Sequence, residues 1–185
     1  MSLQTPLYFA SSNPGKVREF QDAIPEIIQL EIDLPELQSI DSHEIIREKL
    51  QVALEHLEEG TVIVEDTSLV FEAMNGLPGP FIKFYLTQLK KEGIANLVQR
   101  LESQNATAYT VIGVATKDDP EMYFFEGEVK GRIVQPRGEK DFGWGPVFEE
   151  ETTGKTYGEM DIDEKQRVSQ RGIALRKLVE FLKND

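Results

Sequence analysis

The chain of 185 residues contains no cysteine. Without thiols it forms no disulfide, uses no thiolate nucleophile and binds no structural zinc through cysteine, which fits a reducing compartment. Long hydrophobic runs are missing too, so we expect no membrane-spanning helix. The opening residues, MSLQTPLYFASSN, lack the basic and long apolar regions of a secretory signal. These absences predict a cytoplasmic protein with no membrane partner.

Basic residues are scarce relative to acidic ones. Lysine and arginine number 20 against 33 aspartates and glutamates, which leaves a formal net charge of −13. Because nucleic acids bind basic surfaces, this balance disfavours a nucleic-acid partner. It stays compatible with a small phosphorylated ligand, since a divalent metal and a few lysines make a local positive site.

The rest of the composition is that of an ordinary globular protein. Hydrophobic residues make up 39% and charged residues 29% of the chain, and no repeat or linker interrupts it, so we expect a single domain over residues 1–185. Apolar runs predict strands at 7–10, 27–32, 61–66, 108–116 and 122–134, with a hairpin turn at 118–120. Helical spacing predicts helices at 16–24, 44–57, 82–89, 94–101 and 163–183. This mixture predicts an α/β fold with a mixed sheet.

Between the first predicted strand and helix, the segment FASSNPGKVREF makes a tight polar turn. Ser11, Ser12 and Asn13 supply polar side chains, a Pro-Gly pair ending at Gly15 permits a sharp bend, and Lys16 opens the helix. Free N–H groups at a helix N-terminus, together with a lysine, form an anion site. The same residues are equally typical of a capped turn with a solvated lysine. The pattern is not the glycine-rich P-loop, which the chain lacks.

Two acidic residues close the apolar run TVIVED. A carboxylate at the end of a buried strand is costly unless it is paired, hydrated or bound to metal. Because side chains alternate along a strand, we expect Glu65 and Asp66 on opposite faces, with one of them toward a ligand. Glu36, in a predicted loop, is a candidate second ligand, because Mg²⁺ takes one or two carboxylates together with phosphate oxygens and water. A purely structural role is the competing interpretation for both Asp66 and Glu36.

Three further groups are ambiguous on pattern alone. Lys49 lies on a predicted helix rich in glutamate, where a solvated, ion-paired face is the default. Phe142 and Trp144 lie in the segment FGWG and either stack on a base or close the edge of a core. Lys165 and Arg171 do not share a face of one continuous helix. Both serve one ligand only if that helix begins after Lys165.

Seven segments, in order along essentially the whole chain, tie these pieces together. They are FASSNPGKVREF, IDLPELQ, VEDTSLVFEAMNGLPGPFIKFYL, FFEGEVKGRIVQPRG, FGWGPVF, TYGEM and EKQRVSQRGIAL. The series resembles the inosine triphosphate pyrophosphatase family, hydrolases of non-standard purine nucleoside triphosphates. Each segment alone is a weak signal, whereas the seven in sequence are a strong one.

The resemblance implies two lobes around a long central mixed β-sheet flanked by helices, with the nucleotide in a cleft between the lobes. It also implies a Mg²⁺-dependent reaction that releases pyrophosphate and a nucleoside monophosphate from ITP, dITP or XTP, in a cytoplasmic homodimer. Water attacks the α-phosphorus as pyrophosphate leaves, and metal and lysines stabilise the developing charge. No covalent nucleophile is needed, in keeping with the lack of cysteine.

The resemblance also assigns roles to residues. The substrate, through its triphosphate, would contact Ser11, Ser12, Asn13, Gly15, Lys16, Lys49 and Thr67. Glu36 and Asp66 would bind the metal. Asp66 would also orient or deprotonate the attacking water, with Lys16 as the second catalytic residue. The base would contact Phe142, Gly143, Trp144, Lys165, Gln170 and Arg171.

Two positions depart from the family pattern, and both belong to the base end of the site. Gly145 stands where the family usually has aspartate, and Gln170 stands where it usually has histidine. A polar mismatch at a base edge changes affinity by about 1–3 kcal/mol. The phosphate and metal positions match. The alternative to the pyrophosphatase is therefore a nucleotide-binding protein with weakened catalysis or an altered base preference.

Overall fold

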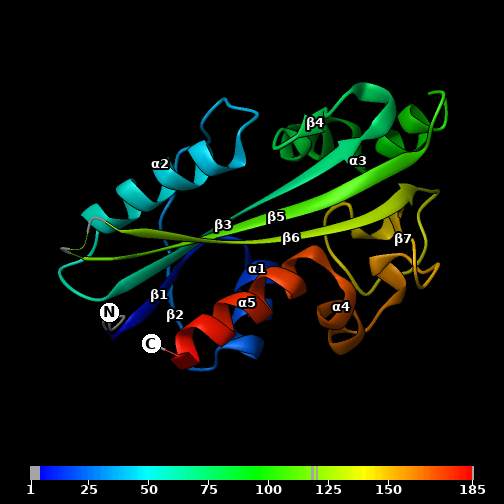
Figure 1. Ribbon diagram of the computed structural model, residues 1–185. Helices are drawn as coiled ribbons and strands as arrows, with labels where there is room; N and C mark the ends of the chain where they lie inside the picture. Colours follow the sequence, from blue (N-terminus) through cyan, green and yellow to red (C-terminus); the bar gives the residue numbers. More distant parts are fainter. Residues whose placement is uncertain (1–4, 118, 120, 185) are drawn as a thin grey trace. The chain divides into compact units, whose positions relative to one another are not determined.

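The computed structural model describes residues 5–117, 119 and 121–184, which fold into two compact units (Figure 1). Unit 1 takes the described residues up to 66, those in 111–126 and those from 174 on, and unit 2 takes 67–110 and 127–173. Strands β3 (Thr61–Phe71), β5 (Asn105–Thr116) and β6 (Met122–Ile133) contribute residues to both units. The expectation of a single domain stays a prediction.

In the described part of the chain, seven strands form one sheet in the order β2-β1-β3-β5-β6-β7, with β4 paired to β3. Within unit 1, β1 (Leu7–Ala10) runs parallel to both β2 (Ile28–Leu30) and β3. Within unit 2, β4 (Pro78–Gly79) is antiparallel to β3, and β7 (Phe148–Glu150) is antiparallel to β6. Parallel and antiparallel pairs in one helix-flanked sheet confirm the predicted α/β class with a mixed sheet.

Unit 1 carries α1 (Pro14–Ala23), α2 (Ser42–Glu55) and most of α5 (Gln170–Asn184). Ile112 of β5 belongs to a buried cluster with Phe20 of α1 and Leu178 of α5. At the next residue, Gly113, a side chain would instead meet Ile46 of α2. Because successive residues of a strand face opposite sides, α1 and α5 cover one face of the unit 1 strands and α2 covers the other (Figure 1).

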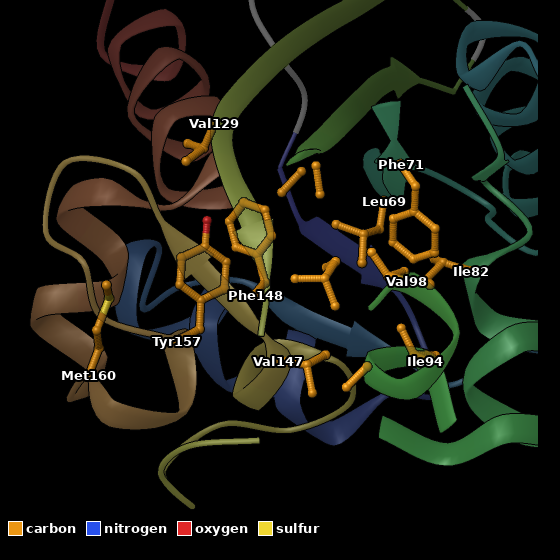
Figure 2. Packing of buried hydrophobic residues seen from close by; sticks show 14 residues of the cluster. Leu69, Phe71, Ile82, Ile94, Val98, Val129, Val147, Phe148, Tyr157 and Met160 are labelled. Carbon is orange, nitrogen blue, oxygen red and sulfur yellow. The ribbon is translucent and has the colours of Figure 1, made fainter. Parts of the chain in front are cut away.

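Unit 2 packs helical segments of different lengths around its own core. They are η1 (Glu72–Met74), α3 (Ile82–Val98), η2 (Gly145–Val147), η3 (Tyr157–Glu159) and α4 (Ile162–Val168). Figure 2 shows Leu69 and Phe71 of β3 beside Val98 of α3, and Phe148 beside Tyr157. The rings of Phe148 and Tyr157 lie 5.2 Å apart, a distance typical of a favourable aromatic pair.

The strand predicted to end at Asp66 is longer than expected. It continues to Phe71, so Glu65 and Asp66 lie inside β3 and not at its end. The apolar residues that follow carry the strand onward, because Leu69 and Phe71 are fully buried. Both acids are tolerated within the strand since each has a lysine partner, which a strand pattern alone does not reveal.

The helix predicted over 163–183 is in fact two helices. It breaks at Ser169, whose φ of −75° and ψ of 156° are extended, so α4 ends at Val168 and α5 begins at Gln170. In α3 the predicted interruption at Gly93 is instead at Lys90, with φ 59° and ψ 176°. Strands β4 and β7 and the three short helices η1, η2 and η3 were not predicted.

Other predicted elements are confirmed with shifted ends. The bounds of α1, α2, β2, β5 and β6 differ from the predicted ranges by a few residues, as is usual for element ends. The predicted hairpin turn falls on positions 118 and 120, which lie outside the described residues. No helix in the described ranges is long and apolar enough to span a bilayer.

We expect acid to weaken unit 2 through Glu149 of β7. Burial by itself raises the pKa of Glu149, but hydrogen bonds and charges from Arg132 and Arg137, both at 2.5 Å, bring that pKa below its ordinary value. The unfolded chain therefore takes up this proton first as pH falls, so the contribution is complete at pH 7 and is lost below about pH 5. Urea unfolding from pH 7 to pH 3 should show a shallower loss of stability in Glu149→Gln. Equal slopes in both proteins would contradict this.

Candidate active site

The opening turn is a capped helix start. Asn13 lies before the first helical residue, and its Oδ1 accepts the backbone N–H groups of Gly15 at 3.0 Å and Lys16 at 3.2 Å. Ser11 Oγ in turn accepts the N–H of Asn13 at 3.2 Å. The N–H groups of Gly15 and Lys16 are thus used by the cap, as the capped-turn alternative predicts. Ser12 lies exposed at the tip of the turn.

Lys16 of α1 forms an ion pair with Glu65 of β3. The Glu65 side chain is 1% exposed and the Lys16 side chain 21%. The lysine stem thus reaches from the helix start down to a buried carboxylate, which limits the positions of its ammonium group. The structure therefore does not show Lys16 as the solvated lysine of an ordinary capped turn.

Lys49 of α2 and Asp66 of β3 form a second, deeper ion pair. Lys49 Nζ donates to Asp66 Oδ1 at 2.7 Å, and their side chains are 9% and 10% exposed. Burial by itself lowers the pKa of Lys49, but the charge and hydrogen bond of Asp66, with the charges of Glu36 and Glu65, hold that pKa above its ordinary value. The default expectation of a solvated face for Lys49 was therefore wrong.

The side chains of Glu65 and Asp66 alternate along β3, as strand geometry predicts. Lys49 Nζ nevertheless also donates to the Glu65 carbonyl oxygen at 3.4 Å, so both pairs adjoin the same point of the strand. Glu65 takes its lysine from α1 and Asp66 takes its lysine from α2, the helices that cover the two faces of unit 1. The α2 face is the more buried place for a cation, since Lys49 is less exposed than Lys16.

Asp66 has one oxygen to spare. Its Oδ2 is buried and has no hydrogen-bond partner among the described residues. Glu36, in the exposed loop before α2, is close enough for its charge to act on Lys49. In the described ranges no three Asp, Glu or His side chains are grouped as a ready-made metal site. A spare carboxylate oxygen and one further acid fit a cation whose other ligands are phosphate and water.

A second set of predicted residues gathers in unit 2 around Phe142, a residue that is 39% exposed. Lys165 Nζ lies 4.8 Å and Arg171 Cζ 5.9 Å from the centre of that ring, within cation–π range. The condition stated for both cations to serve one ligand is met, because the helix that carries Arg171 begins at Gln170, after Lys165. The extended backbone at Ser169 separates α4 from α5, so each helix directs one cation at the same ring.

Two roles were considered for the aromatic residues of the FGWG segment: stacking on a base and closing the edge of a core. Trp144 has the second role, and Phe142 is available for the first. Trp144 packs against the unit 2 core, 5.6 Å from Phe148 and 6.1 Å from Tyr157 between ring centres. Phe142 is the exposed member of the pair. Between them, Gly143 has φ 64°, a left-handed conformation that favours glycine.

The two remaining predicted residues, Gln170 and Thr67, are held by buried or partly buried hydrogen bonds. Tyr157 donates its hydroxyl to Gln170 Oε1 at 2.8 Å, and burial raises the pKa of that phenol, so it stays a donor. Arg171 Nη2 donates to Thr67 Oγ1 at 3.2 Å, and Thr67 Oγ1 also lies 3.0 Å from Thr110 Oγ1. These contacts fix the orientation of an amide and a guanidinium, groups that read base edges in other proteins.

The sequence did not point to two residues of the candidate site, Asp141 and Tyr157, and it left the role of Glu65 undecided. Asp141 accepts from Lys165 Nζ at 2.6 Å, and Tyr157 orients Gln170. Glu65, whose part was undecided, holds Lys16. The sequence carries no local signal for these pairings, because each joins residues from different elements.

Comparisons with known proteins point to one family. The model of the Ham1 family matches residues 7–181. The inosine triphosphate pyrophosphatase of Giardia intestinalis is 42% identical in an alignment of 185 positions that covers 97% of this chain and 93% of that protein. The inosine triphosphate pyrophosphatase of Aspergillus fumigatus is 38% identical over 181 residues, covering 96% of this chain and 95% of that protein.

A solved structure gives the same result. The Ham1 protein of Staphylococcus aureus superposes with a TM-score of 0.80 at 27% identity, over 97% of this chain and 99% of that one. The family match and the relatives each span nearly the whole chain, so they bear on both sets of residues. The chain therefore belongs to the Ham1 family.

Proposed function

We propose that this protein hydrolyses non-standard purine nucleoside triphosphates such as ITP, dITP and XTP, releasing pyrophosphate and the nucleoside monophosphate. The observation that carries the proposal is the buried Lys49–Asp66 pair, in which Asp66 keeps its Oδ2 atom without a hydrogen-bond partner among the described residues. The names of the Giardia and Aspergillus relatives support the same reaction.

The charges of the unit 1 residues call for a divalent cation. Lys16 pairs with Glu65 and Lys49 pairs with Asp66, while the charges of Glu36 and Glu65 also act on Lys49. Two lysines thus accompany three carboxylates, which leaves a net negative charge. A triphosphate is repelled by such a group unless a cation is bound as well. We assign Glu36 and Asp66 to that cation, Mg²⁺, because Mg²⁺ combines one or two carboxylates with phosphate oxygens and water.

When bound, the metal neutralises charge on the phosphates and polarises the P–O bonds. Asp66 orients the attacking water and accepts its proton as the water oxygen bonds to the α-phosphorus. The bond from the α-phosphorus to the bridging oxygen breaks, and pyrophosphate leaves. Lys49 and Lys16 stabilise the negative charge that develops on the phosphates, and Glu65 and Asp66 hold both ammonium groups in place. Ser11, Ser12, Asn13, Gly15 and Thr67 complete the assigned substrate contacts.

The base is assigned to the unit 2 residues. Phe142 offers an exposed ring for stacking, with Gly143 and Trp144 shaping the segment that carries it. The ammonium of Lys165 and the guanidinium of Arg171 are donors only, so they favour a 6-oxo purine over adenine, which has an amino group at that position. Gln170 contributes an amide whose oxygen is engaged by Tyr157.

We also propose that the protein works as a cytoplasmic homodimer. The resemblance implies both properties, and the lack of cysteine is in keeping with a reducing compartment. Light scattering coupled to size-exclusion chromatography tests the dimer: a mass near twice 21.0 kDa is expected. A monomer mass at the concentrations used for the enzyme assay would overturn it.

A substrate panel tests the reaction. Purified protein with Mg²⁺ is incubated with ITP, XTP, dITP, GTP and ATP, and pyrophosphate and orthophosphate are measured separately. We expect ITP, XTP and dITP to release pyrophosphate and little orthophosphate. The rate of pyrophosphate release from ATP should be much lower. Chelation by EDTA should stop the reaction, and added Mg²⁺ should restore it.

The same panel separates the alternatives left open by Gly145 and Gln170. Turnover near background for every base, with nucleotide still raising the melting temperature, identifies a binding protein without efficient catalysis. Fast release of pyrophosphate from a different base identifies an enzyme of altered preference. Orthophosphate as the main product removes the assigned reaction altogether.

A further inference from the structure

One buried ion pair in unit 2 joins residues that sequence reasoning did not connect. Asp141, in the segment after β6, accepts from Lys165 Nζ of α4 at 2.6 Å. The two side chains are 7% and 8% exposed. A buried pair of this kind holds both groups tightly, because removal of either one leaves an uncompensated charge.

Asp141 has this position because residue 145 has no side chain. A Cβ atom at Gly145 would lie 1.7 Å from Asp141 Oδ2 and 2.6 Å from its Cγ. Gly145 does not have a positive φ, so the backbone itself does not require glycine there. Position 145 requires glycine because the carboxylate of Asp141 occupies the space that a side chain there would take.

The ion pair places the Lys165 ammonium close to aromatic rings. Lys165 Nζ lies 4.8 Å from the ring centre of Phe142 and 5.7 Å from that of Tyr157. An ammonium group only donates hydrogen bonds, so its location decides which base atoms are recognised. Lysine is also flexible, with a long side chain that holds one position only when a partner fixes it.

We propose that Asp141 sets the base specificity of the site by positioning Lys165, and that Gly145 leaves the space that the Asp141 carboxylate occupies. Asp141 holds Lys165 where its ammonium meets the 6-oxo group of the base, the task that a carboxylate at position 145 would otherwise share. The family that this chain resembles usually has that carboxylate at 145, and in this chain residue 141 supplies one. The assignment rests on the proposed function, because it concerns the base of the same substrate.

The first test removes the charge of Asp141. In Asp141→Asn we expect kcat/KM for ITP relative to ATP to fall about tenfold, mainly through KM for ITP, as for the loss of one base contact. Glu164→Gln is the matched control. It removes the exposed Lys155–Glu164 pair, in which the two side chains lie 2.7 Å apart and Glu164 is on the same helix α4 as Lys165, and it should leave the ratio unchanged. An unchanged ratio in Asp141→Asn overturns the proposal.

A second readout does not depend on turnover. Trp144 is the one tryptophan of the chain, and it lies in the segment that carries Phe142. Its fluorescence is followed while inosine monophosphate or adenosine monophosphate is added. Wild type should bind the inosine form more tightly, and Asp141→Asn should lose most of that difference. Equal preference in both proteins overturns the proposal.

A double-mutant cycle tests the role of Gly145. In the wild-type background Gly145→Ala should reduce the ITP to ATP ratio about as much as Asp141→Ala, because the new methyl group displaces the carboxylate. In the Asp141→Ala background it should add little, since the carboxylate is gone. Additive losses overturn the proposal. Wild type that releases no pyrophosphate from any purine overturns the proposed function instead, so the two failures are distinguishable.

Discussion

Asp66→Asn is expected to abolish pyrophosphate release, with kcat/KM for ITP reduced by about a thousandfold or more, as for the loss of a general base. The amide still accepts a hydrogen bond from Lys49, but it neither takes a proton from water nor offers Mg²⁺ a charged ligand. Because Lys49 keeps the nearby charges of Glu36 and Glu65, the free energy of unfolding should fall by only about 1–2 kcal/mol. Pyrophosphate assays and urea unfolding measure the two effects.

Glu150→Gln is a suitable control for Asp66→Asn. Glu150 is also a buried carboxylate, 4% exposed, but it accepts the backbone N–H groups of Thr152 and Thr153 at the end of β7 and takes no part in the assigned chemistry. Its substitution should lower stability and leave activity near that of wild type. Full activity in Asp66→Asn would remove Asp66 from the mechanism.

Gly113→Val should be among the most destabilising single substitutions in unit 1. A Cβ atom at Gly113 of β5 would lie 2.2 Å from Ile46 Cγ2 and 3.0 Å from Leu50 Cδ1, and both α2 side chains are fully buried. Valine therefore pushes α2 off the strands, at a cost of about 3 kcal/mol or more. That is a large part of the 5–15 kcal/mol typical of a whole protein. Urea unfolding midpoints measure the loss.

The same substitution should also lower activity, because Lys49 lies on α2 between Ile46 and Leu50. Shortening Ile46 offers a check on the mechanism. In the Ile46→Ala background the Cγ2 atom is absent, so Gly113→Ala should cost much less than it does in wild type. If the cost is the same in both backgrounds, crowding against Ile46 is not its cause.

Much of the fold was predictable because buried positions follow simple periods. The apolar residues of α2 recur at helical spacing, and its buried positions Ile45, Ile46, Leu50 and Ala53 face the strands as that spacing predicts. Strand β1 was recognisable as a continuous apolar run. The mixed sheet followed from the order of these elements along the chain.

The sequence pattern failed where a distant residue changes what a local pattern means. Glu65 and Asp66 resembled the end of a strand, yet Lys16 and Lys49 make both acids acceptable inside β3. At Ser169 the helical periodicity continues on both sides of the break. Its mark is Gly172, where a Cβ atom would lie 1.8 Å from the Gln166 carbonyl oxygen, a contact that the sequence pattern does not reveal. Such breaks arise from tertiary packing, which outweighs local propensity.

The candidate site shows the same division. The resemblance supplied Lys49, Asp66, Lys165 and Arg171 as positions, and the structure adds the partner of each one. Asp141 was not foreseen, because an acid next to an aromatic residue in a loop carries no signal of a lysine far along the chain. Partners of this kind require coordinates, since they join elements that the sequence keeps apart.

The way unit 1 is assembled has a consequence for its biosynthesis. Its buried cluster combines Leu7 and Phe9 of β1 with Leu175 and Leu178 of α5. On the ribosome, β1 and α1 emerge long before α5. Their apolar faces therefore stay exposed to solvent until α5 has been translated. Such delayed closure slows folding and favours aggregation of nascent chains. We therefore expect trigger-factor-type or Hsp70-type chaperones to raise the soluble yield during synthesis more than they speed refolding of the finished protein.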